Sequence, residues 1–265
     1  MDIAKESGYS ERHLRRWFDG YLYKAPLWTI KRRAGIRMLV DGTWLDKEHC
    51  LIVYRDNASK STVYYRFASA EKEYEIIKDL EAFKQLKISI SSFTTDGAED
   101  IIRAIKYAYP RTTRQRCIVH IELECLSWLT QHPKSSAGIT LRRLVTKISY
   151  IKTHNDKLFW LKELMKWHED NEEFIKQKTV NKETGEKTYT HDSVRRAYIH
   201  LHRAIPNMFK HLYQPDVPNN TNGLESFFGH LKDNLRIHRG LSLEHRNNFI
   251  KWYIFFANEK KKNGG

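Results

Sequence analysis

Three acidic residues, each in a different predicted element, could meet at one point of the fold. They are Asp41, inside a predicted strand, Asp96, at the end of another, and Glu225, in the first turn of a late predicted helix. An ionised carboxylate inside an apolar strand is costly unless it meets a cation or a metal ion. Acids at strand ends are also where α/β folds commonly place their chemistry.

Carboxylates brought together repel one another unless divalent cations lie among them, and such hard oxygen ligands suit Mg²⁺ or Mn²⁺. Two ions roughly 3.5 to 4 Å apart can activate an attacking hydroxyl and stabilise the leaving oxygen of an in-line phosphoryl displacement. The chain has 46 Lys and Arg against 32 Asp and Glu, a net charge of +14 that favours a polyanionic partner. Acids and charge together predict metal-dependent chemistry on a phosphodiester backbone.

Each acid also has a purely structural interpretation. Asp41 could be a strand-end or bulge residue, and Asp96 could cap the helix that follows it. Glu225 could simply favour the positive end of its helix dipole. The metal-site hypothesis therefore depends on the three side chains meeting.

Length and composition limit the classes of protein to which this chain can belong. With 265 residues, 40% hydrophobic and 12% aromatic, the chain can bury the core of one large or two smaller domains. It has no apolar run of about 18 residues and no apolar signal region after Met1, which predicts neither membrane insertion nor export but a cytoplasmic location. The three cysteines, Cys50, Cys117 and Cys125, form no CxxC pair, which argues against a disulfide framework or a four-ligand zinc module.

The stretch from residue 36 to residue 119 alternates between strand and helix patterns. Three segments rich in Val, Ile, Tyr and Thr are predicted to form antiparallel hairpins, because turn residues separate them. A helix then crosses over, so the next strand should run parallel to the first, as its neighbour. This order predicts an α/β fold with a mixed five-stranded sheet. The predicted strands are 36–45, 49–56, 61–67, 87–95 and 113–119, ending at His120; the helices are 70–86, with Tyr74, Ile77, Leu80 and Phe83 buried, and 98–108.

Residues beyond 120 are predicted to be mainly helical. An all-α insertion over about 121–212 contains a mobile loop from Lys178 to Lys187. The late helix runs from 222 towards 258 with a break at Gly240, and it could lie across the first and fourth strands. Its apolar stripe is Leu224, Phe227, Phe228, Leu231 and Leu235, while Glu225, Lys232 and Arg236 share another face. The predicted insertion helices are 121–131, 137–152, 156–176 and 192–212.

The N-terminus fits part of a helix-turn-helix. Gly8 would supply the turn and Ser10 would cap a second helix, whose basic side chains would face DNA. A plain helical hairpin with a solvated basic face is the alternative. Because such a unit needs a further helix, we expect the chain to start inside a larger DNA-binding region. The basic residues are Arg12, Arg15 and Arg16; the predicted segments are 1–20 for this unit, 21–35 for a linker, 36–258 for the main domain and 259–265 for a disordered tail.

Cys117 and His120 have the spacing of half a zinc site. Without further cysteine or histidine pairs, a buried thiol beside a satisfied histidine is the competing interpretation.

Several short motifs resemble those of a known family. They are Asp41-Gly42-Thr43, Thr95-Asp96-Gly97, Cys117-x-x-His120 and Thr221-Asn222-x-x-Glu225-x6-Lys232. The set resembles that of DDE transposases of bacterial insertion sequences, in the group related to eukaryotic Mutator elements. The resemblance covers about residues 36–258, and LKDNLRIHRGLSLEHRNNFIKWY is similar to the tail of a zinc-ribbon-bearing subgroup.

The resemblance implies a ribonuclease-H-like core with a helical insertion, which binds two Mg²⁺ or Mn²⁺ ions through Asp41, Asp96 and Glu225. It implies cleavage at transposon ends and transfer of the 3′-hydroxyl into target DNA, by a homodimer acting in the bacterial nucleoid. Terminal inverted repeats and target DNA would be the double-stranded partners. Lys232, Arg236 and Arg239 would contact phosphates, so that binding weakens with salt. Cys117, His120 and Asn222 match a family signature of unknown role.

This chain lacks the subgroup's cysteine-rich ribbon and first helix, which leads us to expect impaired recognition of transposon ends. One alternative is a catalytically inactive, truncated remnant that only binds DNA. Another is a helix-turn-helix regulator that binds an operator through residues 10–18 and senses a ligand with its larger domain. That second alternative leaves the three acids unexplained.

Overall fold

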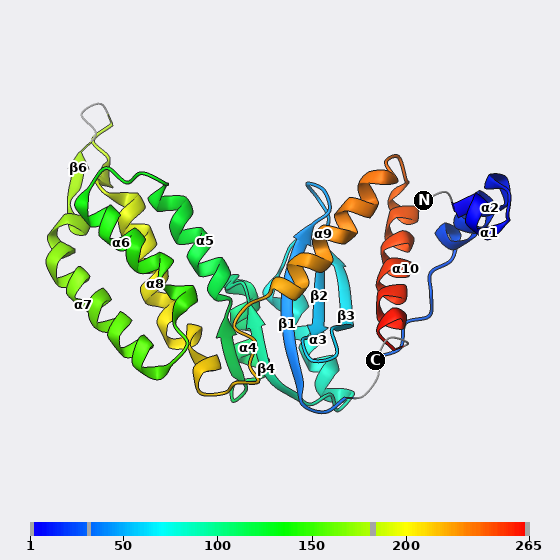
Figure 1. Ribbon diagram of the computed structural model, residues 1–265, viewed down its shortest axis with the longest axis horizontal. Helices are drawn as coiled ribbons and strands as arrows, with labels where there is room; N and C mark the ends of the chain where they lie inside the picture. Colours follow the sequence, from blue (N-terminus) through cyan, green and yellow to red (C-terminus); the bar gives the residue numbers. More distant parts are fainter. Residues whose placement is uncertain (1–2, 31–32, 181–183, 263–265) are drawn as a thin grey trace.

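The computed structural model describes residues 3–30, 33–180 and 184–262, built around one mixed five-stranded sheet (Figure 1). The strand order is β3-β2-β1-β4-β5. β2 is antiparallel to both β1 and β3, whereas β4 is parallel to β1 and to β5. The α/β class, the mixed sheet and the adjacency of the first and fourth strands are therefore confirmed. The strands are β1 (Ile36–Trp44), β2 (Cys50–Asp56), β3 (Ser61–Ala68), β4 (Ile90–Thr95) and β5 (Thr113–Arg116).

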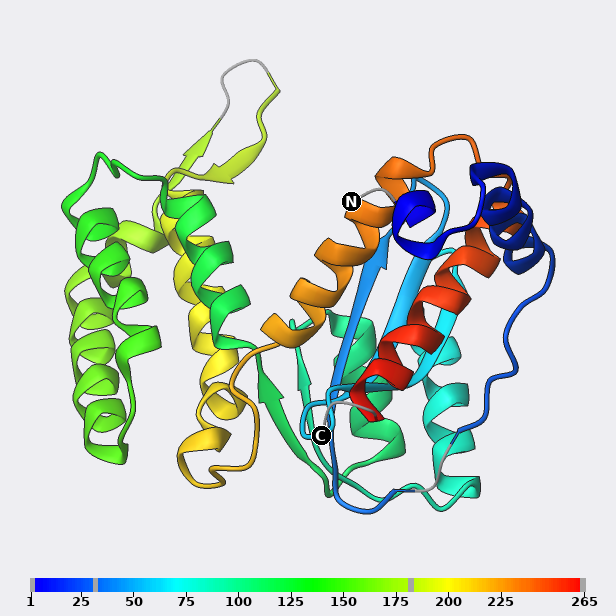
Figure 2. The same cartoon turned by 45° about the vertical axis from the view of Figure 1, so that its right-hand side comes forward.

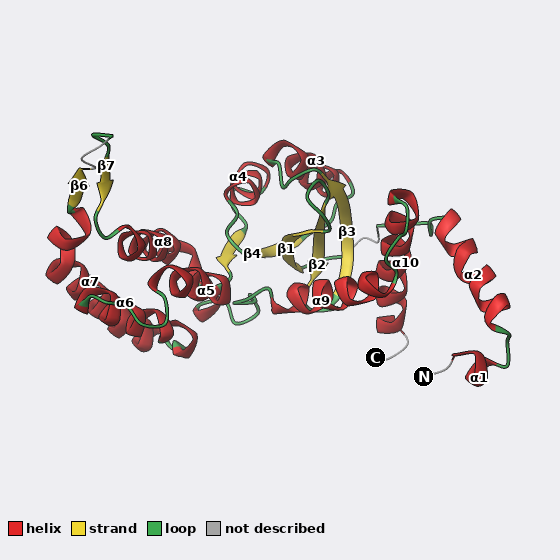
Figure 3. Ribbon diagram, turned by 90° about the horizontal axis from the view of Figure 1, so that it is seen from above, coloured by secondary structure: helices red, strands yellow, loops and turns green. Residues whose placement is uncertain are grey.

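Helices cover both faces of the sheet, as Figure 3 shows from above. One face carries α3 (Glu73–Gln85) and α4 (Glu99–Ala108); the other carries α9 (Asn222–Ile237) and α10 (Leu243–Lys262). Successive side chains of a strand point to opposite faces. Val40 accordingly packs in the core under α3, while Leu39 packs under α9. The predicted break of the late helix near Gly240 is confirmed.

The buried face of α3 differs from the predicted one. Tyr74 is 53% exposed, whereas Ile76 is fully buried together with Leu80 and Phe83. The helix is rotated relative to the predicted orientation because Asp79, its one buried acid, forms hydrogen bonds with polar side chains of the sheet. Tyr54 Oη and Arg66 Nε donate to Asp79 Oδ2 at 3.0 and 2.8 Å.

A separate helical unit with its own core follows β5 (left in Figure 1). Trp160 is buried at its centre and donates its indole N–H to the Leu144 carbonyl at 2.9 Å. The predicted loop from Lys178 to Lys187 begins with a short strand, 178–180, which pairs with another over 187–189, and residues 181–183 lie outside the described residues. The elements are α5 (Ile118–Leu129), α6 (Ser136–Thr146), η1 (Ile148–Tyr150), α7 (His154–Lys176), β6 (Lys178–Val180), β7 (Lys187–Tyr189), α8 (Asp192–Met208) and η2 (Lys210–Leu212).

The fifth strand is shorter than predicted. It ends at Arg116. The Cys117 N–H still donates to the Thr95 carbonyl of β4, but the Ile118 N–H donates to the Asn219 carbonyl, so the pairing with β4 stops and α5 begins. The prediction of a strand through residue 119 was therefore wrong. His120 lies in the first turn of a helix.

At the N-terminus, α1 (Ile3–Ser7) and α2 (Glu11–Tyr23) are joined by a turn in which Gly8 has φ 73°. Ser10 caps α2 by accepting from the His13 N–H, as predicted. The body of α2 packs on α10, where Phe18 meets Phe249 edge to face and Asn248 donates to the Leu22 carbonyl.

Two predicted segment boundaries were wrong. Because α2 continues to Tyr23, residues 21–23 are not linker, and residues 31–32 of the predicted linker lie outside the described residues. Because α10 continues to Lys262, residues 259–262 are helical rather than a disordered tail, and 263–265 also lie outside the described residues.

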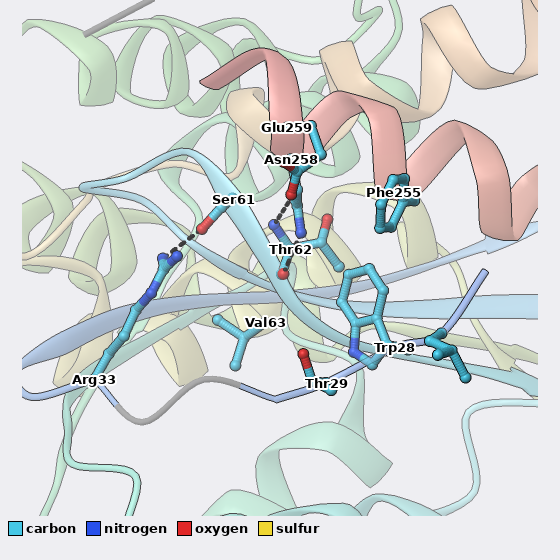
Figure 4. A pocket seen from close by; sticks show the side chains of 10 residues that line it. Trp28, Thr29, Arg33, Ser61, Thr62, Val63, Phe255, Asn258 and Glu259 are labelled. Atoms are coloured by element: carbon cyan, nitrogen blue, oxygen red, sulfur yellow. Dashed lines mark hydrogen bonds between the residues drawn. The ribbon is translucent and has the colours of Figure 1, made fainter. Parts of the chain in front are cut away.

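The C-terminal end of α10 covers the outer edge of the sheet, at β3 (Figure 4). The Thr62 N–H donates to Asn258 Oδ1 at 2.8 Å, and Asn258 Nδ2 donates to the Thr62 carbonyl at 2.9 Å. Asn258 thereby satisfies edge groups that would otherwise pair with another chain. A cavity of about 160 Å³ lies beside this contact, next to Trp28 and Arg33. None of the described helices is long and apolar enough to cross a membrane.

Candidate metal centre

Asp41 and Asp96 occupy adjacent positions on two neighbouring parallel strands, Asp41 within β1 and Asp96 directly after β4. Val40 is paired with Thr95, and the two acids are the next residues of β1 and of the chain after β4. Neighbouring strands lie about 4.8 Å apart, so the two side chains lie close together at the same end of these central strands. Asp41 is regularly paired with Val53, which rules out a bulge at this position.

Asp96 does not cap the helix after it, because the N-cap of α4 is Ala98. It forms a tight turn instead, in which Asp96 Oδ1 accepts from the Ala98 N–H at 2.9 Å.

The side chain environment of Asp41 opposes its ionisation. The residue is only 7% exposed. Burial, followed by the nearby charge of Asp96, raises the pKa of Asp41 from 3.8 to about 7, although His120 acts in the opposite direction. A carboxylate in this position is a strong candidate for a bound cation, which would replace the proton.

Glu225 approaches the aspartates only indirectly, through His120. Among the described residues, the carboxylates of Asp41, Asp96 and Glu225 do not all lie within 4.8 Å of one another. The helix that carries Glu225, α9, packs on β1 and β2 through Leu224 and Phe227 rather than lying across β1 and β4 as expected (Figure 2). The segment leading into α9 is nevertheless tied to β4, because Thr94 Oγ1 donates to the Pro218 carbonyl at 2.8 Å. Glu225, in the first turn, therefore enters from the β4 side of the sheet.

His120 connects Glu225 with Asp41. Its Nδ1 lies 3.6 Å from Glu225 Oε1 and 3.3 Å from Thr221 Oγ1. A hydrogen bond with Cys117, together with the charges of Cys117, Asp41 and Glu225, raises the pKa of His120 to about 9 despite its burial. The imidazolium thus offsets part of the carboxylate repulsion. Cys117 is fully buried, which matches the interpretation of a buried thiol beside a satisfied histidine.

A fourth carboxylate, Glu71, was missed by the sequence reasoning, which placed it on a surface helix. It lies just before α3 and against Gly42, where a Cβ atom would be 1.9 Å from Glu71 Oε1. Burial, followed by the charges of Asp96 and Asp100, raises the pKa of Glu71 to about 7. The glycine directly after Asp41 was the available signal, because a residue without a side chain admits a close neighbour.

Arg116 supports the turn at Asp96. Its Nη2 donates to the Asp96 carbonyl at 3.3 Å, and it lies against Gly97, whose φ of 108° favours glycine. On its other side Arg116 approaches His200, which lies 3.0 Å from Glu124. Arg116 is thus a positioning residue for the loop that carries Asp96.

The predicted DNA-contacting cations are divided between two places. Lys232, Arg236 and Arg239 are exposed and line one groove of about 690 Å³, together with Arg246, where α9 turns into α10. The helix that carries the other three arginines, α2, lies on the far side of α10 from the sheet (Figure 1). Asn222 is exposed at the start of α9. The α2 arginines are Arg12, Arg15 and Arg16, all exposed, with Arg15 paired to Glu11 at 3.9 Å.

Gly42→Ala should weaken divalent-metal binding about tenfold, the effect typical of an outer partner of a metal site, by displacing the Glu71 carboxylate. The fold should survive, because the displaced atoms are the end of a flexible side chain. Calorimetric titration with Mn²⁺ measures the affinity, and circular dichroism the melting temperature. Gly223→Ala is the matched control, since its nearest contact would be an ordinary 3.7 Å to Leu39. Equal affinity in both variants would exclude Glu71 from the site.

The metal-free protein should lose stability as pH rises from about 4 to about 9. The folded pKa values are about 7 for Asp41 and Glu71, against 3.8 and 4.5, and about 9 for His120, against 6.5. Folding raises the pKa of all three groups. Their contribution to the free energy of unfolding is therefore complete below the unfolded-state pKa and is lost as pH rises through the folded-state pKa. Mg²⁺ should therefore raise the melting temperature more at the alkaline end. Scanning fluorimetry across this range measures both effects, and Asp41→Asn should flatten the metal-free slope; an unchanged slope would contradict the assignment.

No protein-family model matches the chain, and no curated protein matches its sequence. The chain is an α/β protein whose mixed five-stranded sheet carries a cluster of acids at one end of its central strands.

Proposed function

We propose that the chain is a metal-dependent DNA transposase with a ribonuclease-H-like catalytic core, of the kind found in DDE transposases of Mutator-related bacterial insertion sequences. The observation that supports the proposal is that Asp41 and Asp96 follow paired residues of adjacent strands, while His120 lies beside Glu225 and interacts with the charge of Asp41. Two of these acids come from adjacent parallel strands, and the third comes from a helix whose leading segment is tied to β4. The cytoplasmic, homodimeric form implied by the resemblance belongs to the same proposal.

The donor set fits a hard divalent cation. Its ligands are carboxylate oxygens, and the raised pKa of Asp41 comes from burial beside another acid. Asp41, Asp96 and Glu225 would hold the metal, with Glu71 as a further carboxylate next to Gly42. Mg²⁺ or Mn²⁺ bound there would neutralise the acids and lower the pKa of a coordinated water or hydroxyl.

The remaining residues have separate tasks. His120 can donate a hydrogen bond to an oxygen of the scissile phosphate, because its imidazole lies 27% exposed beside Glu225. Arg116 holds the Asp96 turn. Lys232 lies seven residues after Glu225 on the same helix face, about 10 Å along the axis. The DNA backbone would therefore run along α9 towards the groove lined by Arg236 and Arg239.

The test is cleavage of DNA by the intact chain. Supercoiled plasmid incubated with Mg²⁺ or Mn²⁺ should accumulate nicks, and the same reaction with EDTA should not. The nicks should carry 3′-hydroxyl ends that a polymerase extends, and no protein should remain covalently attached. Joining of a labelled 3′-hydroxyl oligonucleotide to the plasmid tests strand transfer.

A folded protein that binds DNA but nicks it with neither metal would refute the catalytic proposal. That outcome would support the alternative of a DNA-binding protein without catalysis. Binding confined to one operator sequence would support the regulator instead.

A further inference from the structure

A second set of ligands lies next to the acids and has a different chemical character. Cys117 Sγ, His120 Nδ1 and Glu225 Oε1 all lie within 4.8 Å of one another. The imidazole and carboxylate atoms are already 3.6 Å apart. Tetrahedral Zn²⁺ with ordinary bond lengths places such ligand atoms roughly 3.3 to 3.6 Å apart. Closing the triangle therefore requires movements of about 1 Å.

The backbone holds these three residues in place. Cys117 occupies the N-cap position of α5 and His120 follows three residues later, so both side chains face the same side of the first turn. The start of α9 is tied to this turn, because the Thr221 N–H donates to Cys117 Sγ at 3.4 Å. The Thr221 hydroxyl contacts both of the other ligands, 3.3 Å from His120 Nδ1 and 3.4 Å from Glu225 Oε1.

We infer that Cys117, His120 and Glu225 form a second metal site, which takes Zn²⁺ or a similar transition-metal ion and shares Glu225 with the carboxylate site. A thiolate and an imidazole favour such ions, whereas Mg²⁺ prefers oxygen ligands. Binding releases the thiol proton and the imidazole Nδ1 proton to solvent. Solvent reaches the site on the side of Glu225, which is 40% exposed, so water can supply the fourth ligand.

Sharing of one ligand has a consequence for regulation. An ion held by Cys117 and His120 draws Glu225 away from Asp41 and Asp96. Zn²⁺ should therefore compete with Mg²⁺ and inhibit cleavage. This consequence rests on the proposed function, whereas metal binding at the three residues does not.

Co²⁺ is the probe, because a thiolate ligand gives a charge-transfer absorption in the near ultraviolet and tetrahedral geometry gives strong visible bands. One equivalent of Co²⁺ should produce both, and Zn²⁺ should abolish them. Cys117→Ser should remove the charge-transfer band and weaken Co²⁺ binding by at least about 100-fold, beyond the effect of an outer-shell partner. Cys125→Ser, at another buried free cysteine, should keep the band. Asp96→Asn should also keep it.

Two results would overturn the inference. One is the absence of a thiolate band in the wild-type protein at excess Co²⁺, which needs no variant to fold. The other is a band that survives Cys117→Ser or disappears in Cys125→Ser. Zn²⁺ inhibition that Cys117→Ser relieves would support the regulatory consequence. A thiolate band in a protein that never cleaves DNA would refute the proposed function and leave the metal site standing.

Discussion

Asp96→Asn should reduce metal-dependent DNA cleavage at least about 1,000-fold, equivalent to about 4 kcal/mol of lost transition-state stabilisation. The amide retains an oxygen for the turn, where Asp96 Oδ1 accepts from the Ala98 N–H, so the local backbone should stay in place. The negative charge disappears, and with it a ligand of the proposed metal site. DNA binding without metal should be unchanged or tighter, because one repulsive charge near the phosphates is gone.

The same substitution should stabilise the metal-free protein. The charge of Asp96 contributes to the raised pKa of both Asp41 and Glu71, so its removal relieves repulsion in the folded state. Single-turnover cleavage and thermal melting in EDTA measure the two effects. Asp216→Asn is the control, since that carboxylate is 80% exposed and paired with Arg37. Cleavage by Asp96→Asn at the wild-type rate would refute the catalytic assignment.

Asp79→Ala should produce the largest loss of stability, about 3 kcal/mol, because the buried Tyr54 hydroxyl loses its acceptor and Arg66, whose side chain is 26% exposed, loses its ion pair. Asp79 is buried between α3 and the sheet, where it accepts from Tyr54 Oη and pairs with Arg66. Its removal leaves a buried hydroxyl and a half-buried guanidinium without their acceptor. Urea unfolding followed by circular dichroism measures the change.

Metal affinity should not change in Asp79→Ala, because this acid belongs to the core under α3 and not to the acids at the end of the central strands. Glu81→Ala is the control on the same helix; its pair with Lys84 is exposed, so the loss should stay below about 1 kcal/mol. Equal stability of the two variants would contradict the structural role of Asp79. If Asp79→Ala also lost Mn²⁺ affinity, the conclusion that Asp79 is separate from the acids of the proposed metal site would be wrong.

Local patterns were sufficient for most of the secondary structure and for part of the site. The strand patterns and the single crossover helix placed Asp41 and Asp96 on neighbouring parallel strands, because a crossover of that length returns the chain alongside the first strand. The 3.6-residue stripe of α9 predicted its buried face correctly. Side-chain periodicity failed for α3, because both of its faces carry large apolar side chains and only the pairing of Asp79 with Arg66 selects one.

The sequence by itself determined which strands lie side by side and which acids end on them, since both follow from short-range pattern and chain order. Only the tertiary structure decided that Glu71 and His120 join those acids and that Cys117 faces Glu225. These neighbours depend on contacts between distant segments, such as the hydrogen bond from Thr221 to Cys117 across 104 residues. Periodicity within one element carries no information about such contacts, because they arise only when separate helices and strands pack together.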